Sequence, residues 1–251
     1  MHSQFYTDLV SELYEPLVST RAKADDYVSF IERAGQPVLE LGCGPGLPML
    51  DLVERGYNVE GLDASADMLE QCRANAAKRN LQVTLYHQEM QAMSLPKQYA
   101  AIFLAGPTLN LIISDDDAVA SLQGIYAHLR PGGQVLIPLM IERPEAVNKE
   151  NFGKFKETKD AAGALLRVGA IDGEFDEDKR LVRHRLRYEK IHPDGREESL
   201  ERDWFLHWWP QAEFRQYLEN TGFTNIRARR FDGKPVDEDD DFFVFLCEKE
   251  G

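Results

Sequence analysis

The chain reads Glu40-Leu41-Gly42-Cys43-Gly44-Pro45-Gly46 between a short apolar run and a longer periodic one. Glycines in such a loop let the backbone turn tightly and let a ligand lie against main chain that carries no side-chain bulk. Their spacing indicates the kind of ligand. A dinucleotide-binding loop has the pattern G-x-G-x-x-G, which would place the third glycine at position 47. That position is Leu47, and the third glycine is Gly46, so the pattern here is G-x-G-x-G.

Short apolar runs alternate with longer amphipathic ones on both sides of this loop. We expect strands at residues 37–41, 58–62, 82–87, 100–105 and 134–138, and helices at residues 47–55, 66–79 and about 119–129. Strands and helices that alternate at this spacing form βαβ units, in which helices cover both faces of a parallel sheet. The sequence therefore predicts an α/β fold with a doubly wound, mainly parallel sheet.

The pattern changes after about residue 143. Residues 182–189 alternate between apolar and charged side chains, residues 192–195 favour a turn, and residues 204–209 alternate again, which predicts an antiparallel hairpin. A third strand is expected at residues 165–171. A helix at residues 210–220 and strands at 225–231 and 242–248 complete the chain. We therefore expect one domain over residues 1–251, with an antiparallel lobe inserted at residues 143–209.

Composition excludes several classes of protein. There are 29 Lys and Arg against 43 Asp and Glu, so the net charge is −14, which argues against binding dominated by nucleic-acid phosphates or anionic lipid. The cysteines Cys43, Cys72 and Cys247 form no C-x-x-C pair, so neither a disulfide framework nor a metal site is expected. No signal peptide or membrane span is evident, because the most apolar run, residues 100–113, is short and interrupted. We expect a cytoplasmic protein.

A G-x-G-x-G loop after an acidic residue is the first motif of the class I S-adenosylmethionine-dependent methyltransferases, which this sequence resembles. Asp63 follows the second expected strand, where a carboxylate can accept hydrogen bonds from both hydroxyls of a ribose. Residues 63–69 resemble the family's second motif, in which the methionine, here Met68, packs near the adenine. Glu89 stands where the family usually has an aspartate that meets the adenine amino group, and residues 129–137 resemble the approach to the fifth strand.

This resemblance implies a Rossmann-like sheet of seven strands that ends in an antiparallel hairpin, with the inserted lobe on the substrate side. It implies S-adenosylmethionine as cofactor and S-adenosylhomocysteine as product. The cofactor-binding residues that we expect are Tyr14, Arg21, Glu40, Gly42, Cys43, Gly44, Gly46, Asp63, Ala64, Met68, Glu89, Met90, Leu104 and Ala105. One departure is Ala100, because many members have an aspartate at the start of the fourth strand.

Arg21 belongs to a segment, residues 19–27, that is similar to the part of glycine N-methyltransferase-like enzymes whose arginine holds the cofactor's carboxylate. A fork-shaped guanidinium suits a carboxylate. The alternative is a solvated arginine on a helix face. Tyr6 and Tyr14 are expected in an N-terminal helix that such enzymes fold over the cofactor, where Tyr6 would meet the acceptor; simple packing of the aromatic rings on the core is the alternative.

The expected acceptor-binding residues are Tyr6, Asn110, His207 and Trp209. Asn110 follows the fourth strand, where the family places acceptor-binding residues, although a loop asparagine often bonds its own backbone instead. His207 and Trp209 alternate with Trp208 and offer an aromatic wall suited to a planar or cationic substrate, although strand aromatics often lie in a core. No catalytic residue is assigned, because a base is needed only if the acceptor arrives protonated.

The predicted function is transfer of a methyl group from S-adenosylmethionine to a nitrogen or oxygen of a small molecule. Residues 105–108 lack the Asn/Asp-Pro-Pro-aromatic loop of enzymes that methylate nucleobases, which together with the charge argues against nucleic acid. Two alternatives stay open: a regulatory protein that binds S-adenosylmethionine or S-adenosylhomocysteine without turnover, and a nicotinamide-dependent oxidoreductase, which Leu47 disfavours. The sequence indicates no oligomeric state.

Overall fold

The computed structural model describes residues 5–18, 22–230, 232–237 and 240–251. Its larger sheet has seven strands in the order β10-β11-β5-β4-β1-β2-β3. Strands β1 to β5 pair in parallel, and β11 runs antiparallel to both β5 and β10. The predicted fold class is confirmed. The strands are β1 (Val38–Leu41), β2 (Val59–Asp63), β3 (Leu85–His87), β4 (Tyr99–Leu104), β5 (Leu129–Met140), β10 (Phe223–Arg229) and β11 (Phe242–Lys249).

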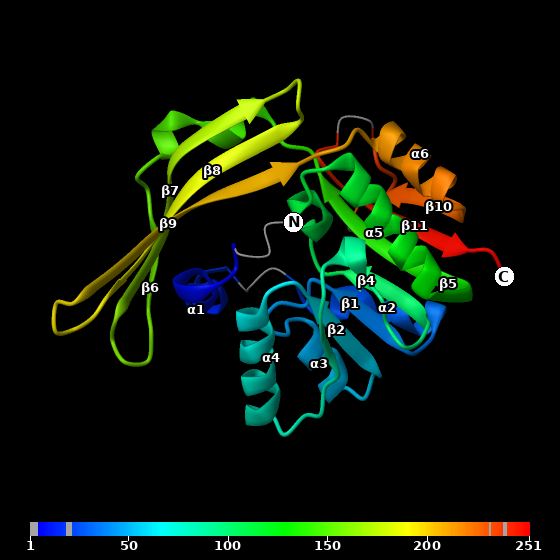
Figure 1. Cartoon of the computed structure of the whole chain (residues 1–251), viewed down its shortest axis with the longest axis horizontal. Coiled ribbons are helices and arrows are strands. Elements are labelled where there is room, and N and C mark those ends of the chain that lie inside the picture. Colours follow the sequence, from blue (N-terminus) through cyan, green and yellow to red (C-terminus); the bar gives the residue numbers. More distant parts are fainter. Residues whose placement is uncertain (1–4, 19–21, 231, 238–239) are drawn as a thin grey trace.

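Helices cover both faces of this sheet (Figure 1). One face packs against α2 (Asp25–Ala34), α3 (Met49–Glu54) and α4 (Ala66–Lys78), and the other against α5 (Asp115–His128) and α6 (Gln211–Thr221). The period of two along each strand divides the apolar side chains between these two layers: Leu39 and Leu41 face α5 and α6, whereas Val38 faces α2 and α3. Each layer is thus a separate hydrophobic cluster.

The ends of two helices follow the predicted signals. The Ser65 hydroxyl accepts a hydrogen bond from the Met68 N–H at 3.2 Å and begins α4, and Gly222, in the left-handed region, ends α6. Two elements begin two or three residues later than expected. Helix α3 begins at Met49 rather than 47, and β3 begins only at Leu85, because β3 is the edge of the sheet and pairs with β2 over three residues.

A second, antiparallel sheet lies between β5 and α6 in the sequence. It contains β6 (Lys156–Lys159), β7 (Leu165–Asp176), β8 (Leu181–Ile191) and β9 (Glu197–His207). The hairpin of β8 and β9 and the strand β7 were predicted. Strand β6 was not, because its sequence Lys-Glu-Thr-Lys has no apolar alternation and it pairs only along one edge of β7. Short 3-10 helices η3 (Pro144–Val147) and η4 (Lys149–Asn151) connect β5 to this lobe.

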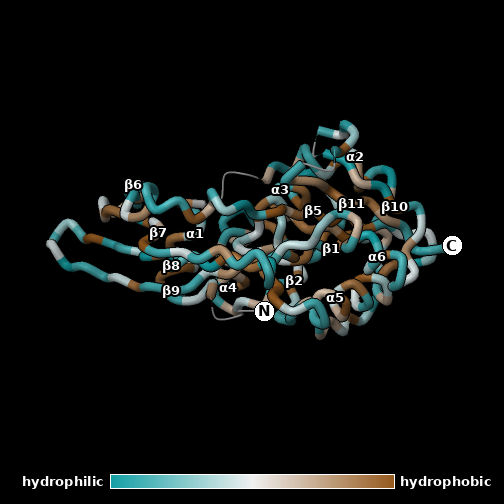
Figure 2. The backbone as a smooth tube through the Cα atoms, turned by 90° about the horizontal axis from the view of Figure 1, so that it is seen from above, coloured by the Kyte–Doolittle hydropathy of each residue, from teal (hydrophilic) through white to brown (hydrophobic). Residues whose placement is uncertain are grey.

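Helix α1 (Asp8–Val18) completes the core of the lobe. Val10, Leu13 and Leu17 are buried against Leu166 and Tyr188 of the smaller sheet. Figure 1 shows α1 between the two sheets, and Figure 2 shows the tips of β8 and β9 projecting beyond it as a hydrophilic hairpin. The N-terminal segment therefore joins the lobe to the rest of the molecule. Within the described ranges, no helix has the length and apolar character needed to cross a membrane.

Candidate functional site

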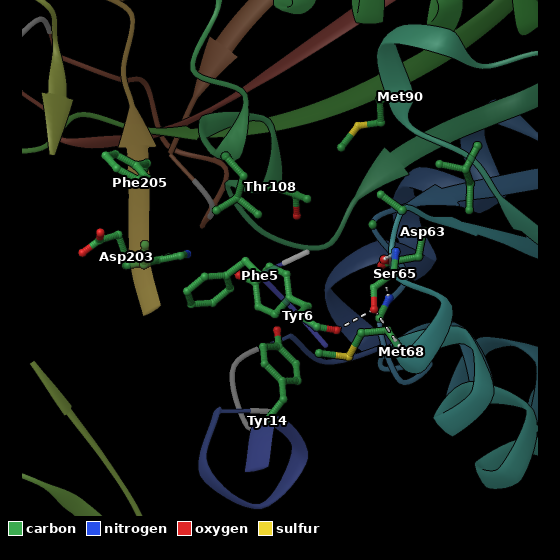
Figure 3. A pocket seen from close by; sticks show the side chains of 16 residues that line it. Phe5, Tyr6, Tyr14, Asp63, Ser65, Met68, Met90, Thr108, Asp203 and Phe205 are labelled. Carbon is green, nitrogen blue, oxygen red and sulfur yellow. Dashed lines mark hydrogen bonds between the residues drawn. The ribbon is translucent and has the colours of Figure 1, made fainter. Parts of the chain in front are cut away.

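A cavity of about 770 Å³, including its mouth, opens where the carboxyl ends of β1 and β2 meet the lobe. Its sixteen lining residues come from three parts of the chain (Figure 3). Asp63, Ser65 and Met68 lie on one side, Asp203 and Phe205 of β9 lie on the other, and Tyr6 lies between them. This is the edge of an open parallel sheet at which ligands bind in α/β folds.

The glycine loop forms one wall of the cavity. Gly42 and Gly44 both line it and have φ angles of +70° and +51°. A Cβ atom on Gly42 would lie 2.6 Å from Cγ2 of Thr108, whereas one on Gly44 would meet nothing within 4 Å. Gly42 is therefore required for packing against η2 (Thr108–Leu111), while Gly44 leaves open space beside the backbone.

Asp63, at the end of β2, holds this loop in place. Its Oδ2 accepts a hydrogen bond from the Gly44 N–H and its Oδ1 one from the Ser65 N–H, both at 2.8 Å. Burial raises the pKa of Asp63, and the two backbone N–H groups oppose that shift. A carboxylate has about four lone-pair positions. It can therefore hold the loop and still accept hydrogen bonds from a ligand.

Glu40 lies behind the loop and is completely buried. Neither of its carboxylate oxygens has a hydrogen-bond partner among the described residues. Burial raises its pKa well above the ordinary value, and the N–H of Met49, outside good hydrogen-bonding geometry, offsets this only in part. A buried carboxylate without a partner is costly, so burial favours the protonated, neutral form of Glu40 in the free protein.

The structure brings together half of the expected cofactor-binding residues. Those that line the cavity are Tyr14, Gly42, Gly44, Asp63, Ala64, Met68 and Met90. Those that do not are Glu40, Cys43, Gly46, Glu89, Leu104 and Ala105, and Arg21 lies outside the described residues. Glu89 instead accepts a hydrogen bond from Gln91 Nε2 at 2.7 Å, and Cys43 is buried beside Cys72.

Of the four expected acceptor-binding residues, only Tyr6 lines the cavity. Asn110 is fully buried, where its amide donates to the carbonyl oxygens of Met140 and His207 at 2.8 and 2.7 Å. Trp209 is also buried and donates from Nε1 to Asp115 at 2.7 Å. These side chains pack where the lobe returns to the core, beyond the end of β9.

His207 lies at the same junction. It is 5% exposed, with Nε2 3.3 Å from Oδ1 of Asp115, and burial lowers its pKa. The cavity is lined instead by residues two to four positions earlier on β9, namely Asp203, Trp204 and Phe205. The sequence pattern predicted the strand and its aromatic side chains. It did not indicate which residues of the strand line the cavity, because that depends on how the lobe packs against the core.

The sequence prediction missed other lining residues: Phe5, Leu62, Ser65, Thr108 and Leu111. Phe5 and Tyr6 also precede α1 instead of lying within it, since that helix begins at Asp8. We call residues 5–8 the N-terminal strap. Among the missed residues from Phe5 to Leu111, Thr108 alone is not adjacent in sequence to a predicted one. It lies near the glycine loop in space, beside Gly42, and no sequence pattern indicated this contact.

The N-terminal strap is held from both sides. On the core side, Ser65 Oγ donates to the Tyr6 carbonyl at 2.5 Å, and the Asp8 N–H donates to Asp67 at 2.7 Å. On the lobe side, Arg202 of β9 donates to the Phe5 carbonyl at 2.6 Å and to the Asp8 carboxylate at 2.6 Å. The strap therefore lies over the cavity as a bridge between the two sheets.

Comparison with known proteins identifies the core of the chain. Residues 38–133 match the family model described as a methyltransferase domain. The dTDP-3-amino-3,6-dideoxy-alpha-D-glucopyranose N,N-dimethyltransferase of Streptomyces fradiae is 28% identical over 140 residues, 53% of either chain. A ubiquinone biosynthesis O-methyltransferase of Psychrobacter cryohalolentis is 27% identical over 113 residues, 45% of this chain and 44% of its own length. The chain thus spans about half the length of these curated relatives.

The likeness in fold extends over the whole chain. The structure of the CcbJ methyltransferase from Streptomyces caelestis is similar with a TM-score of 0.75, over 100% of both chains, at 18% sequence identity. The glycine loop after β1 and the strands β1 to β4 lie within the part matched by the family model. Strands β10 and β11 lie outside that part but belong to the same sheet. Residues 38–133 therefore match the methyltransferase domain family, and the chain has the fold of S-adenosylmethionine-dependent methyltransferases of known structure.

Proposed function

We propose that this chain binds S-adenosylmethionine in the cavity and transfers its methyl group to a nitrogen or oxygen of a small molecule. The observation that carries the proposal is the open space beside Gly44, next to the Asp63 carboxylate, at the carboxyl ends of β1 and β2. Methylation of small molecules by the two relatives, an N,N-dimethyltransferase and an O-methyltransferase, supports the same activity here. A location in the cytoplasm stays a prediction from the sequence.

The residues present fit this cofactor. Asp63 would accept hydrogen bonds from the ribose hydroxyls, and Met68 and Met90 would pack near the adenine. Glu40, buried and without a hydrogen-bond partner in the described part of the chain, suits the ammonium of the methionyl group. Arg21 stays our proposal for the partner of its carboxylate. We also propose that residues 143–209 form the acceptor-side lobe of a single domain.

Methyl transfer depends mainly on the alignment of the acceptor atom, the methyl carbon and the sulfur. When bound, S-adenosylmethionine supplies a methyl group on a sulfonium, and the acceptor must approach that carbon in line with the sulfur. Burial keeps the pKa of the Tyr6 hydroxyl well above its ordinary value, so this group stays protonated and orients the acceptor by hydrogen bonding. The strap, which holds Tyr6, also limits the access of water.

Calorimetry with S-adenosylhomocysteine and NAD tests the proposal, followed by transfer of a labelled methyl group to pools of small metabolites. We expect the Asp63→Ala variant to bind S-adenosylhomocysteine more weakly by about 1–3 kcal/mol. Asp51→Ala, which removes a carboxylate bound to Arg79 away from the cavity, serves as the matched control. Tight binding of NAD without binding of S-adenosylhomocysteine would contradict the proposal.

A further inference from the structure

The part of the cavity that faces the lobe is aromatic. Phe5 and Tyr6 come from the strap, Tyr14 from α1 and Trp204 from β9. The ring centroids of Phe5 and Tyr6 are 4.8 Å apart with the rings at 81°, and those of Tyr6 and Tyr14 are 5.6 Å apart at 90°. In Figure 3, the ring of Tyr14 lies below those of Phe5 and Tyr6, so the three rings gather in one part of the cavity.

The charged side chains that line this space are carboxylates, one of which, Asp203, is paired with Arg183 behind the lining. Among the described residues that line the cavity there is no lysine, arginine or histidine, whereas Asp63 and Asp203 carry carboxylates. The nearby arginines of the lobe are already paired. Arg183 lies 2.7 Å from Asp172 and 3.2 Å from Asp203, and Arg202 is bound to the strap. A carboxylate or phosphate placed beside these rings would therefore lose its hydration without gaining a partner among these residues.

We propose that the aromatic side of the cavity is the acceptor subsite and that it selects an amine, which is a cationic ammonium in water, over acceptors with an anionic group next to the reacting atom. This inference rests on the proposed function. Ring faces attract cations through their quadrupoles, and the attraction grows when both groups are desolvated. An uncharged alcohol of the same shape gains no such attraction, so the preference is one of charge as well as of shape.

Neighbouring polar groups agree with this preference. The pKa of the Tyr6 hydroxyl is raised, first by burial and then by the hydroxyls of Tyr14 and Tyr188 nearby, so no phenolate competes as an internal partner. His184, opposite Trp204 on β8 with ring centroids 5.9 Å apart, has a pKa lowered by burial, so its imidazole is neutral near pH 7 and adds no positive charge.

The transfer step then balances without a protein base. The ammonium first gives a proton to water, the nitrogen lone pair forms the N–C bond, and the C–S bond breaks with its electron pair going to sulfur. The products are a methylated ammonium and neutral S-adenosylhomocysteine. The aromatic side of the cavity holds the nitrogen in its charged state before the proton leaves and again after the methyl group has been transferred.

The test uses the full chain saturated with S-adenosylhomocysteine, so that no methyl donor is present, and three probes without a nitrogen that could accept a methyl group. These are choline, its carbon isostere in which a quaternary carbon replaces the nitrogen, and glycine betaine, which keeps the ammonium and adds a carboxylate. Calorimetry should show choline binding about fivefold or more tighter than either of the other two, the scale of a desolvated cation–π contact.

Two variants test whether the preference for choline arises at the aromatic side of the cavity. Trp204→Leu removes a ring that lines the cavity, and Phe175→Leu removes a ring of the lobe that stacks on Trp208 with centroids 5.0 Å apart, outside the lining. We expect Trp204→Leu, and not Phe175→Leu, to reduce the preference for choline, with affinity for S-adenosylhomocysteine within about twofold of the original protein. Thermal unfolding checks that both variants fold.

The outcomes separate the two proposals. If S-adenosylhomocysteine does not bind, the proposed function fails and this inference fails with it. If S-adenosylhomocysteine binds but choline binds no better than its isostere, or betaine binds as well as choline, the inference alone is overturned. Loss of the preference in Phe175→Leu as well as in Trp204→Leu would also overturn it, since the selectivity would then not belong to the cavity.

Discussion

Gly44 has a positive φ of +51°, and no atom lies within 4 Å of the place where its Cβ would be. A glycine in this conformation costs chain entropy on folding, and no side chain uses the space that it leaves. Gly56, at the end of α3, has a φ of +91° and is equally open, but it lies outside the cavity lining. The two glycines therefore make a matched pair that separates backbone strain from loss of ligand space.

We expect Gly44→Asp to abolish binding of S-adenosylhomocysteine, because its side chain would occupy the open space and bring a second carboxylate beside Asp63. Gly56→Asp should bind it normally. In both variants the left-handed backbone should lower the free energy of unfolding by about 1–2 kcal/mol. Calorimetry and urea unfolding measure the two effects, and unchanged affinity in Gly44→Asp would place the cofactor elsewhere.

Glu40 gives a prediction about pH. Its pKa is raised in the folded protein, so its protonated form stabilises the fold below the ordinary glutamate pKa, and that stability is lost as the pH rises through the raised value. Glu40→Gln removes this charge. The variant should be more stable than the original protein at about pH 8, with the difference vanishing near pH 4.

The same variant should bind S-adenosylhomocysteine more weakly if Glu40 faces the ammonium of the ligand. Urea unfolding across the pH range measures the first effect and calorimetry the second. A residue that weakens the free protein and strengthens the complex is typical of a binding site. Equal stability of the two proteins at every pH would mean that Glu40 keeps a partner in solution.

At the scale of elements, the strap and α1 connect the smaller sheet to the rest of the molecule. Helix α1 supplies the apolar side chains under the smaller sheet, and the strap crosses from Ser65 to Arg202. Four acceptor atoms of the strap lie within reach of the Arg202 guanidinium, in Phe5, Thr7 and Asp8. Any ligand that lies under the strap must be released past these bonds.

We therefore expect Arg202→Met to speed the dissociation of S-adenosylhomocysteine by about tenfold, the scale of losing one or two hydrogen bonds to a charged group. Arg187→Met is the control, because Arg187 sits on β8 and bonds Glu201 at 2.9 Å instead of the strap. Stopped-flow fluorescence measures the dissociation rates. Equal rates in the two variants would show that the strap does not retain the ligand.

For the whole molecule, the position of the lobe is decided at one junction. Asn110 of η2 donates to Met140, where β5 leaves the core, and to His207, where β9 returns, and its Oδ1 accepts from the Met140 N–H at 3.1 Å. Asp115 adds contacts to Trp209 and Arg180 at the same place. Both connections of the lobe to the core are thus tied to the loop after β4.

Asn110→Ala should lower the free energy of unfolding by about 2–4 kcal/mol, because buried backbone groups lose their partners. Asn148→Ala removes an exposed side chain whose Oδ1 accepts a hydrogen bond from the nearby Glu150 N–H, and should change stability by less than about 0.5 kcal/mol. Affinity of folded Asn110→Ala for S-adenosylhomocysteine should not change. Normal stability combined with loss of acceptor turnover would instead favour direct contact with the acceptor.

The seven-stranded core and its glycine loop were predictable from the sequence. The alternation of strands and helices, the cap at Ser65 and the spacing of three glycines all depend on residues close together in the chain. Gly44, Asp63 and Met68, which were predicted to bind the cofactor, line the cavity because each lies at or beyond the carboxyl end of a parallel strand, and those ends meet at one edge of the sheet.

The lobe side of the cavity was not predictable in the same way. A period of two indicates that a strand has two faces, but which part of each face is covered depends on segments far away in the sequence. Trp204 and Phe205 line the cavity while His207 and Trp209 are buried at the junction. The sequence by itself determined the α/β core and the G-x-G-x-G loop, because local spacing sets both. The tertiary structure alone decided the lobe side of the cavity, because it forms only where α1, β9 and the core pack together.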